Sequence, residues 1–152
     1  MSKAKPVFHE FDPIIYPFKI WVATNPEYSQ VARKFLIIDS SGNIDNFREK
    51  DLSNPDNSRA ARTFVVSNKI DQMGVFICVF SKREMTAKYI AHESAHCADF
   101  FAEQLGLTTG KFYEGEAYAY LIGWIANCIE RAIKYKPKKK KKKQDVQNKS
   151  EE

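Results

Sequence analysis

Residues 74–80 read GVFICVF, and this run limits the possible folds of the chain more than any other feature. Nearly every position is apolar, whereas a strand with one solvated face alternates apolar and polar side chains. We therefore expect a strand that is buried on both faces. The preceding run RTFVVSN, residues 62–68, has the composition of a second strand, and the link between the two is short enough for a hairpin.

The rest of the first half gives shorter signals. Residues 1–13 contain two prolines and look irregular. Residues 14–24 are rich in β-forming side chains, and Pro17 limits this strand to a sheet edge or to a strand start. The remaining expectations are a short helix over 26–34 with Asn25 as its cap, a short strand over 35–39, a turn over 40–43 and a polar loop over 45–61.

The second half has helical periodicity. Ser81 and Glu84 have the spacing of a capping box, which predicts a helix over 82–105 with Gly106 as its C-terminal stop. A short connection leads to a second helix over 111–135. Strands followed by two long helices indicate an α+β fold, in which a small antiparallel sheet is backed by two long antiparallel helices.

The net charge of the chain is concentrated at its C-terminal end. The formal charge is +5, from 24 Lys and Arg against 19 Asp and Glu. Residues 136–152 contain eight of the lysines and three of the acidic residues, so residues 1–135 are neutral. We expect a single domain over 1–135 and a disordered basic tail over 136–152. Only the lysine run 138–143 is a candidate for contacting nucleic acid.

The cysteines indicate a reducing environment. Cys78, Cys97 and Cys128 are far apart, form no CxxC pair and stand in apolar segments, so we expect free, buried thiols. The N-terminal residues lack the apolar region of a signal peptide, and no run of about 18 apolar residues is present. We therefore expect a cytoplasmic protein without a membrane span.

The segment His92-Glu93-Ser94-Ala95-His96 carries the chemistry. Residues four apart lie on one face of a helix, so both imidazoles can bind one metal ion. Glu93 lies next to them and can act as general base toward a water molecule at the metal. Two of the three histidines of the chain belong to this motif. The structural alternative is a helix whose histidines are polar surface or core residues by accident.

A third metal ligand follows by elimination. Asp99 is seven residues from His92, which corresponds to a helical rise of about 10 Å and is too far for one ion. His9 stands in the irregular N-terminal segment. We therefore expect a carboxylate from the second helix. Counted from the turn between the two helices, Glu116 lies closer to the position of the motif along the helix axis, and Glu114 is the alternative. Either carboxylate could also be a surface residue.

HESAH, nineteen intervening residues and then the run EAYA from residue 116 resemble the gluzincin pattern of HExxH, a gap, and ExxA or ExxS on the following helix. The compact length and the run YAYLIGWI also resemble small metallopeptidase-like proteins of tailed bacteriophages. The resemblance covers roughly residues 81–129. It implies a zincin-like domain, and the cytoplasm of the host cell as the location if the chain is phage-encoded.

The resemblance also implies roles for residues of this chain. His92, His96 and Glu116 would be the zinc ligands, and Glu93 the general base. Gluzincins often have Asp or Asn directly after the Ala or Ser of the second motif, where it supports a ligand histidine. This chain has Tyr120 there, so either another residue such as Asp99 supports the histidine or the metal site is weaker than in gluzincins.

These observations predict a zinc-dependent hydrolase, most simply a metallopeptidase, with Zn²⁺ between the helices and the sheet. The strand over 62–68 is the candidate for holding an extended peptide substrate by β-augmentation. Tyr113, Tyr118 and Tyr120 are expected to pack the second helix, or alternatively to stabilise an oxyanion. The competing function is that of a non-catalytic zincin-like binding protein, whose basic tail contacts nucleic acid or a protein partner.

Overall fold

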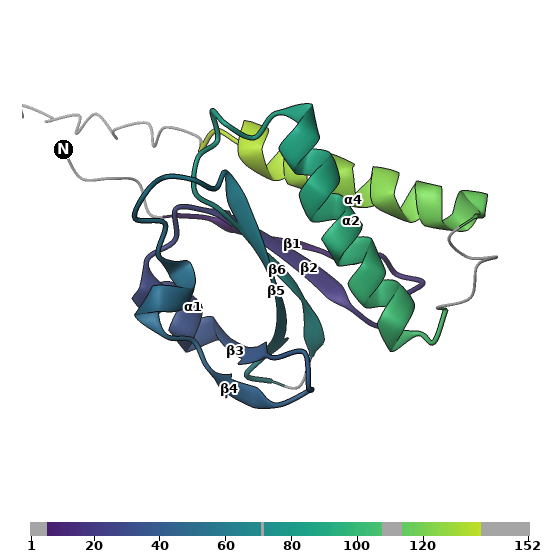
Figure 1. The fold of residues 1–152 in the computed structure, drawn as a ribbon, viewed down its shortest axis with the longest axis horizontal. Helices are drawn as coiled ribbons and strands as arrows, with labels where there is room; N and C mark the ends of the chain where they lie inside the picture. Colours follow the sequence, from purple (N-terminus) through teal and green to yellow (C-terminus); the bar gives the residue numbers. More distant parts are fainter. Residues whose placement is uncertain (1–5, 71, 108–113, 138–152) are drawn as a thin grey trace, which may run out of the picture.

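The computed structural model describes residues 6–70, 72–107 and 114–137. Six strands form one mixed sheet with the order β1-β2-β6-β5-β3-β4, and the helices pack against its two faces (Figure 1). The strands are β1 (Phe8–Phe11), β2 (Lys19–Thr24), β3 (Phe35–Ile38), β4 (Ile44–Asn46), β5 (Ala61–Asn68) and β6 (Met73–Val79). The helices are α1 (Tyr28–Lys34), the short 3-10 helix η1 (Glu49–Leu52), α2 (Ala87–Gln104) and α4 (Glu116–Lys134).

Strand β6 is buried on both faces, as its sequence predicts. All of its residues except Met73 are buried. Val75, Ile77 and Val79 point into a core shared with α2 and α4, whereas Phe76 and Cys78 point into an aromatic core on the opposite face. Because successive side chains of a strand point to opposite faces, an unbroken apolar run requires a packed layer on each side.

The sheet is mixed, so the expected small antiparallel sheet is wrong. The β5–β6 hairpin is antiparallel, with Ala61 opposite Val79, and confirms the prediction for this pair. Strand β2, however, pairs with β6 in parallel, with Ile20 opposite Val75. Periodicity identifies a strand but not its neighbour. The chain between β2 and β6 forms α1, β3, β4, η1 and β5, and is therefore long enough to return to the same end of the sheet before β6 begins.

The N-terminal half contains more regular structure than expected. Residues 8–11, expected to be irregular, form β1 and pair antiparallel with β2. Strand β2 begins at Lys19, and the residues between Pro13 and Pro17 form the connection. The polar stretch 45–61 includes the end of β4 and the helix η1. The short strands β1 and β4 have weak local patterns and depend on pairing with β2 and β3.

Helix α2 starts five residues later than predicted. Ser81 does not cap it; instead the Glu84 amide donates to the Ser81 carbonyl in a turn, and Thr86 is the N-cap. The predicted stop at Gly106 is confirmed. Gly106 has a φ of +66°, and the Leu107 amide donates to the Ala102 carbonyl at 2.8 Å, which is the Schellman arrangement.

Helices α2 and α4 cover one face of the sheet, and α1 packs against the other (Figure 1). Helix α2 lies against β5 and β6, while α4 contacts α2 and lies against β2. The two long helices touch but cross at an angle, rather than forming the side-by-side antiparallel pair that was expected (Figure 1). Helix α4 begins at Glu116 rather than at residue 111. Within the described ranges, no helix is long and apolar enough to cross a lipid bilayer.

Gly74 is required where β6 and β2 lie side by side. A Cβ atom at this position would be 2.1 Å from the Lys19 carbonyl oxygen and 2.7 Å from the Trp21 ring. Gly74→Ala should therefore push the parallel pair apart and lower the free energy of unfolding by about 2–4 kcal/mol. The measurement is urea unfolding followed by circular dichroism.

Gly123→Ala is the matched control. Gly123 lies inside α4, and nothing stands within 4 Å of the position that a Cβ would take. This change should raise the free energy of unfolding by about 0.5–1 kcal/mol, because alanine favours the helix. Equal stabilities for the two variants would contradict the close approach of β2 to β6.

Candidate functional site

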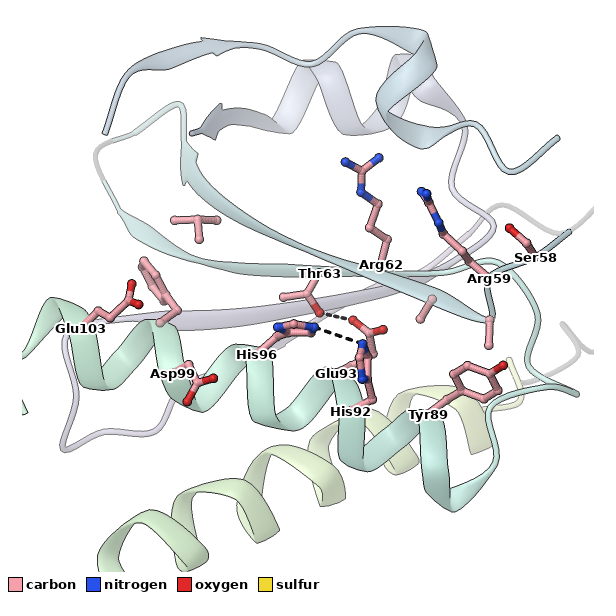
Figure 2. Close-up of a pocket in the computed structure, with 14 residues that line it drawn as sticks. Ser58, Arg59, Arg62, Thr63, Tyr89, His92, Glu93, His96, Asp99 and Glu103 are labelled. Atoms are coloured by element: carbon pink, nitrogen blue, oxygen red, sulfur yellow. Dashed lines mark hydrogen bonds between the residues drawn. The ribbon is translucent and has the colours of Figure 1, made fainter. Parts of the chain in front are cut away.

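A cavity of about 630 Å³ lies between β5 and α2 (Figure 2). One wall is a single face of α2, because its lining residues recur at intervals of three or four. The other wall is the first half of β5 with the loop before it. The residues that line the cavity are Ser58, Arg59, Ala60, Ala61, Arg62, Thr63, Val65, Tyr89, His92, Glu93, His96, Asp99, Phe100 and Glu103.

The two imidazoles of the HESAH motif converge in this cavity. His92 and His96 are exposed, and their Nε2 atoms lie 3.1 Å apart. Two nitrogen ligands about 2.1 Å from one ion at a tetrahedral angle would be about 3.4 Å apart. The observed separation fits either a hydrogen bond between the rings or two ligands of a single ion. The helix alone produces this convergence, as the i and i+4 spacing predicts.

Glu93 is buried beside the histidines, with 4% of its surface exposed. The Thr63 hydroxyl of β5 donates a hydrogen bond to Glu93 Oε2 across the cavity (Figure 2). This bond uses one carboxylate oxygen and fixes the orientation of the other. A buried carboxylate that is held beside two imidazoles is arranged to accept a proton from a molecule bound in the cavity.

Part of the β5 edge faces the cavity. Strand β3 pairs only with residues 66–68 of β5. The Ala60 carbonyl accepts hydrogen bonds from Phe80 and Ser81 on the β6 side, so by alternation the backbone groups of Ala61, Thr63 and Val65 point away from β6. No strand in the described ranges pairs with this stretch. An extended peptide could therefore add to β5 directly opposite the histidines.

The predicted third ligand is not in the cavity lining. Glu116 is the first residue of α4, Glu114 lies in the turn before it, and both are exposed. The register that favoured Glu116 assumed a helix from residue 111, whereas α4 starts at Glu116. Within the described ranges, no third His, Cys, Asp or Glu joins the pair in a group able to hold a metal ion. The assignment of Glu116 stays a prediction.

Asp99 links the site to α4. Its carboxylate lines the cavity one turn after His96 and accepts a 2.5 Å hydrogen bond from the Tyr118 hydroxyl. Tyr120 is 75% exposed and lines a different cavity, while Tyr113 lies outside the described residues, as does the lysine run 138–143. The hydroxyl of Tyr118 is therefore directed to a carboxylate at the edge of the site.

The cysteines lie in the core, as predicted. All three thiols are free and buried. Burial raises the pKa of Cys97 well above the usual thiol value, and the nearby Glu93 and Cys128 raise it further. Burial likewise raises the pKa of Cys78 to about 12 and that of Cys128 to about 11. Protonated, buried thiols are poor nucleophiles and poor metal ligands, so these side chains pack the core.

Thr63 and Arg59 are site residues that sequence reasoning missed. A signal for Thr63 was present, because it shares the face of its strand with Ala61 and Val65, and it is the polar member of that set. Nothing in the sequence showed that this face lies against α2.

Comparison of the chain with protein-family models, with curated proteins and with solved structures finds no match to any of them.

The convergence of His92 and His96 generates a prediction about metal content. The purified protein should hold about one zinc ion per chain, because two imidazole nitrogens at this separation suit zinc. His92→Ala and His96→Ala should each lose most of the metal. The zinc content per chain is measured by inductively coupled plasma mass spectrometry of the purified proteins. His9→Ala is the control, because His9 lies on β1 outside this cavity. Full zinc retention in both motif variants would contradict the assignment.

Proposed function

We propose that the protein is a zinc-dependent hydrolase, specifically a metallopeptidase, in which His92 and His96 bind the ion and Glu93 is the general base. One observation carries the proposal. Two exposed imidazole nitrogens lie 3.1 Å apart beside a buried carboxylate, in a cavity bordered by a free strand edge. The resemblance of HESAH and of the run EAYA from residue 116 to gluzincins supports the same function.

The donor set fits zinc. Neutral imidazole nitrogens are common zinc ligands, and a site that takes few protein ligands keeps a position open for water or substrate. When bound, zinc acidifies a water molecule and polarises a carbonyl group. Magnesium and calcium prefer oxygen ligands, so they are poorer candidates for a pair of imidazoles.

Glu93 would move the proton in the reaction. Its free carboxylate oxygen accepts a proton from the attacking water and then gives it to the leaving amine. The Thr63 hydroxyl holds the other oxygen, so the carboxylate does not rotate away between the two steps. Burial of Glu93 keeps bulk water from competing for the proton.

The open edge of β5 would bind the substrate backbone. The amide and carbonyl groups of Ala61, Thr63 and Val65 face the position of an added strand. Backbone pairing tolerates many side chains and holds the scissile amide beside α2. This arrangement favours an extended peptide over a small ester or a sugar as substrate.

Glu116 remains our proposed third zinc ligand, and its test is separate. Glu116→Gln should weaken zinc affinity at least tenfold, because an amide is a much poorer ligand than a carboxylate. Glu114→Gln is the matched control, since it makes the same change two residues away and should bind zinc like the wild type. Chelator competition measures both affinities. The reverse order would assign the third ligand to Glu114.

The central test of catalysis is Glu93→Gln. This change keeps the shape of the side chain but removes the base, so zinc should stay bound while hydrolysis of a peptide library falls about a hundredfold or more. Glu84→Gln, in the exposed turn before α2, should leave the rate unchanged. Product formation is followed by mass spectrometry.

Two outcomes would contradict the proposal. Loss of zinc from Glu93→Gln would make Glu93 a ligand or a support of the metal site rather than the base. Equal rates for wild type and Glu93→Gln, with zinc bound in both, would contradict the proposed hydrolase function and favour a non-catalytic zinc-binding protein.

A further inference from the structure

The cavity between β5 and α2 has opposite charges at its two ends. Arg59 and Tyr89 lie at one end, Asp99 and Glu103 lie at the other, and the histidine pair lies between them (Figure 2). Arg59 and Glu103 are both exposed, so their charges reach a ligand in the groove. The local field therefore reverses sign along the groove.

Neighbouring groups reinforce this polarity. At the Arg59 end, the Lys88 ammonium lies 5.6 Å from the centre of the Tyr89 ring. Helix α2 begins at this end, with Ala87, and ends beside Glu103, with Gln104. The helix dipole thus places partial positive charge beside Arg59 and partial negative charge beside Glu103. Side chains and backbone act in the same direction.

The other charged side chains of the lining, Glu93 and Arg62, do not give either end the opposite charge. Glu93 is buried beside the histidines, between the two ends (Figure 2). Arg62 also lines the cavity, but its guanidinium donates to the Asp51 carbonyl at 2.9 Å and lies over the Phe64 ring. Contacts with η1 and with Phe64 therefore hold the Arg62 guanidinium on the face of β5 opposite to the cavity. Asp99 is bound by the hydroxyl of Tyr118, a neutral donor. Asp56 interacts with Arg59 but is not in the cavity lining.

The spacing of the charges suits an extended peptide. Glu103 is seven residues after His96 on α2, a rise of about 10 Å. A peptide in strand conformation covers this distance with about three residues. Arg59 precedes Thr63 by four residues on the opposite side of the histidines. Side chains within about three or four positions of the scissile bond would therefore reach one charged end or the other.

We propose that the groove selects peptide substrates by the order of their charges, with basic side chains toward Asp99 and Glu103 and acidic side chains toward Arg59. This inference rests on the proposed peptidase function. Antiparallel addition to β5 is the more stable pairing. Since β5 runs from the Arg59 end toward the Glu103 end, the substrate would carry its basic residues before the scissile bond and its acidic residues after it.

Two peptides of identical composition test the proposal. One has a block of lysines, an apolar centre and a block of glutamates, and the other has the blocks exchanged. Their equal net charge removes any bulk effect of the basic residues after position 136. Binding of end-labelled peptides to Glu93→Gln is followed by fluorescence anisotropy, and cleavage is measured with zinc-loaded wild type.

The lysine-first peptide should bind about three- to tenfold more tightly than its reverse, the range expected for a few exposed ion pairs, and added salt should reduce the difference. Glu103→Lys should abolish this preference, and Arg59→Glu together with Glu103→Lys should invert it. Asp45→Lys is the matched control. It makes the same charge change on β4, at a residue that does not line the groove, and should keep the preference.

The outcomes separate this inference from the proposed function. Equal binding of the two peptides, a preference for the glutamate-first peptide, or an unchanged preference in Glu103→Lys would overturn the charge-order proposal. Cleavage of both peptides at equal rates would overturn it as well and leave the peptidase function standing. Charge-ordered binding without cleavage of either peptide would support the groove polarity and count against the peptidase function.

Discussion

Burial of β6 on both faces is the constraint on which the rest of the structure depends. Its even-numbered and odd-numbered side chains enter different cores, so the sheet needs helices on both sides. The parallel contact with β2 at Gly74 and the hairpin with β5 fix the neighbours of β6. The hairpin in turn places Thr63 on the face that α2 covers. The position of the candidate site thus depends on an apolar strand that contributes no side chain to the cavity.

Helix α2 serves the core and the site with different faces. Cys97 and Phe101 are fully buried against the sheet and α4, whereas His92 and His96 are exposed on the adjacent face. Glu93 lies at the border between the two and is buried although it is a carboxylate. A buried polar group needs a hydrogen-bond partner, and Thr63 provides one from β5. The packing that stabilises the helix therefore also sets the position of the Glu93 carboxylate.

The parts of the structure that the sequence predicted are those with strong local causes. The run at 74–80 predicted a strand buried on both faces, the i and i+4 spacing predicted that His92 and His96 converge, and Gly106 predicted the end of α2. The parallel β2–β6 pair could not be predicted, because period and composition do not name a strand's neighbour. The start of α2 was misjudged, because a turn at Ser81 has the same composition as a capping box.

The register of the β5–β6 hairpin decides whether the site exists. Thr63 lies opposite Ile77, and this pairing points its hydroxyl toward Glu93. A shift of one residue would send Thr63 to the aromatic face and bring Arg62 or Phe64 toward α2. The shift is prevented because Phe64 and Val66 would then leave the aromatic core that they fill with Phe76. The short β3 completes the arrangement. By pairing only with residues 66–68, it leaves the backbone beside Thr63 free for a ligand. The groove, the buried Glu93 and the charged ends of the groove therefore depend on apolar packing on the opposite face of the sheet.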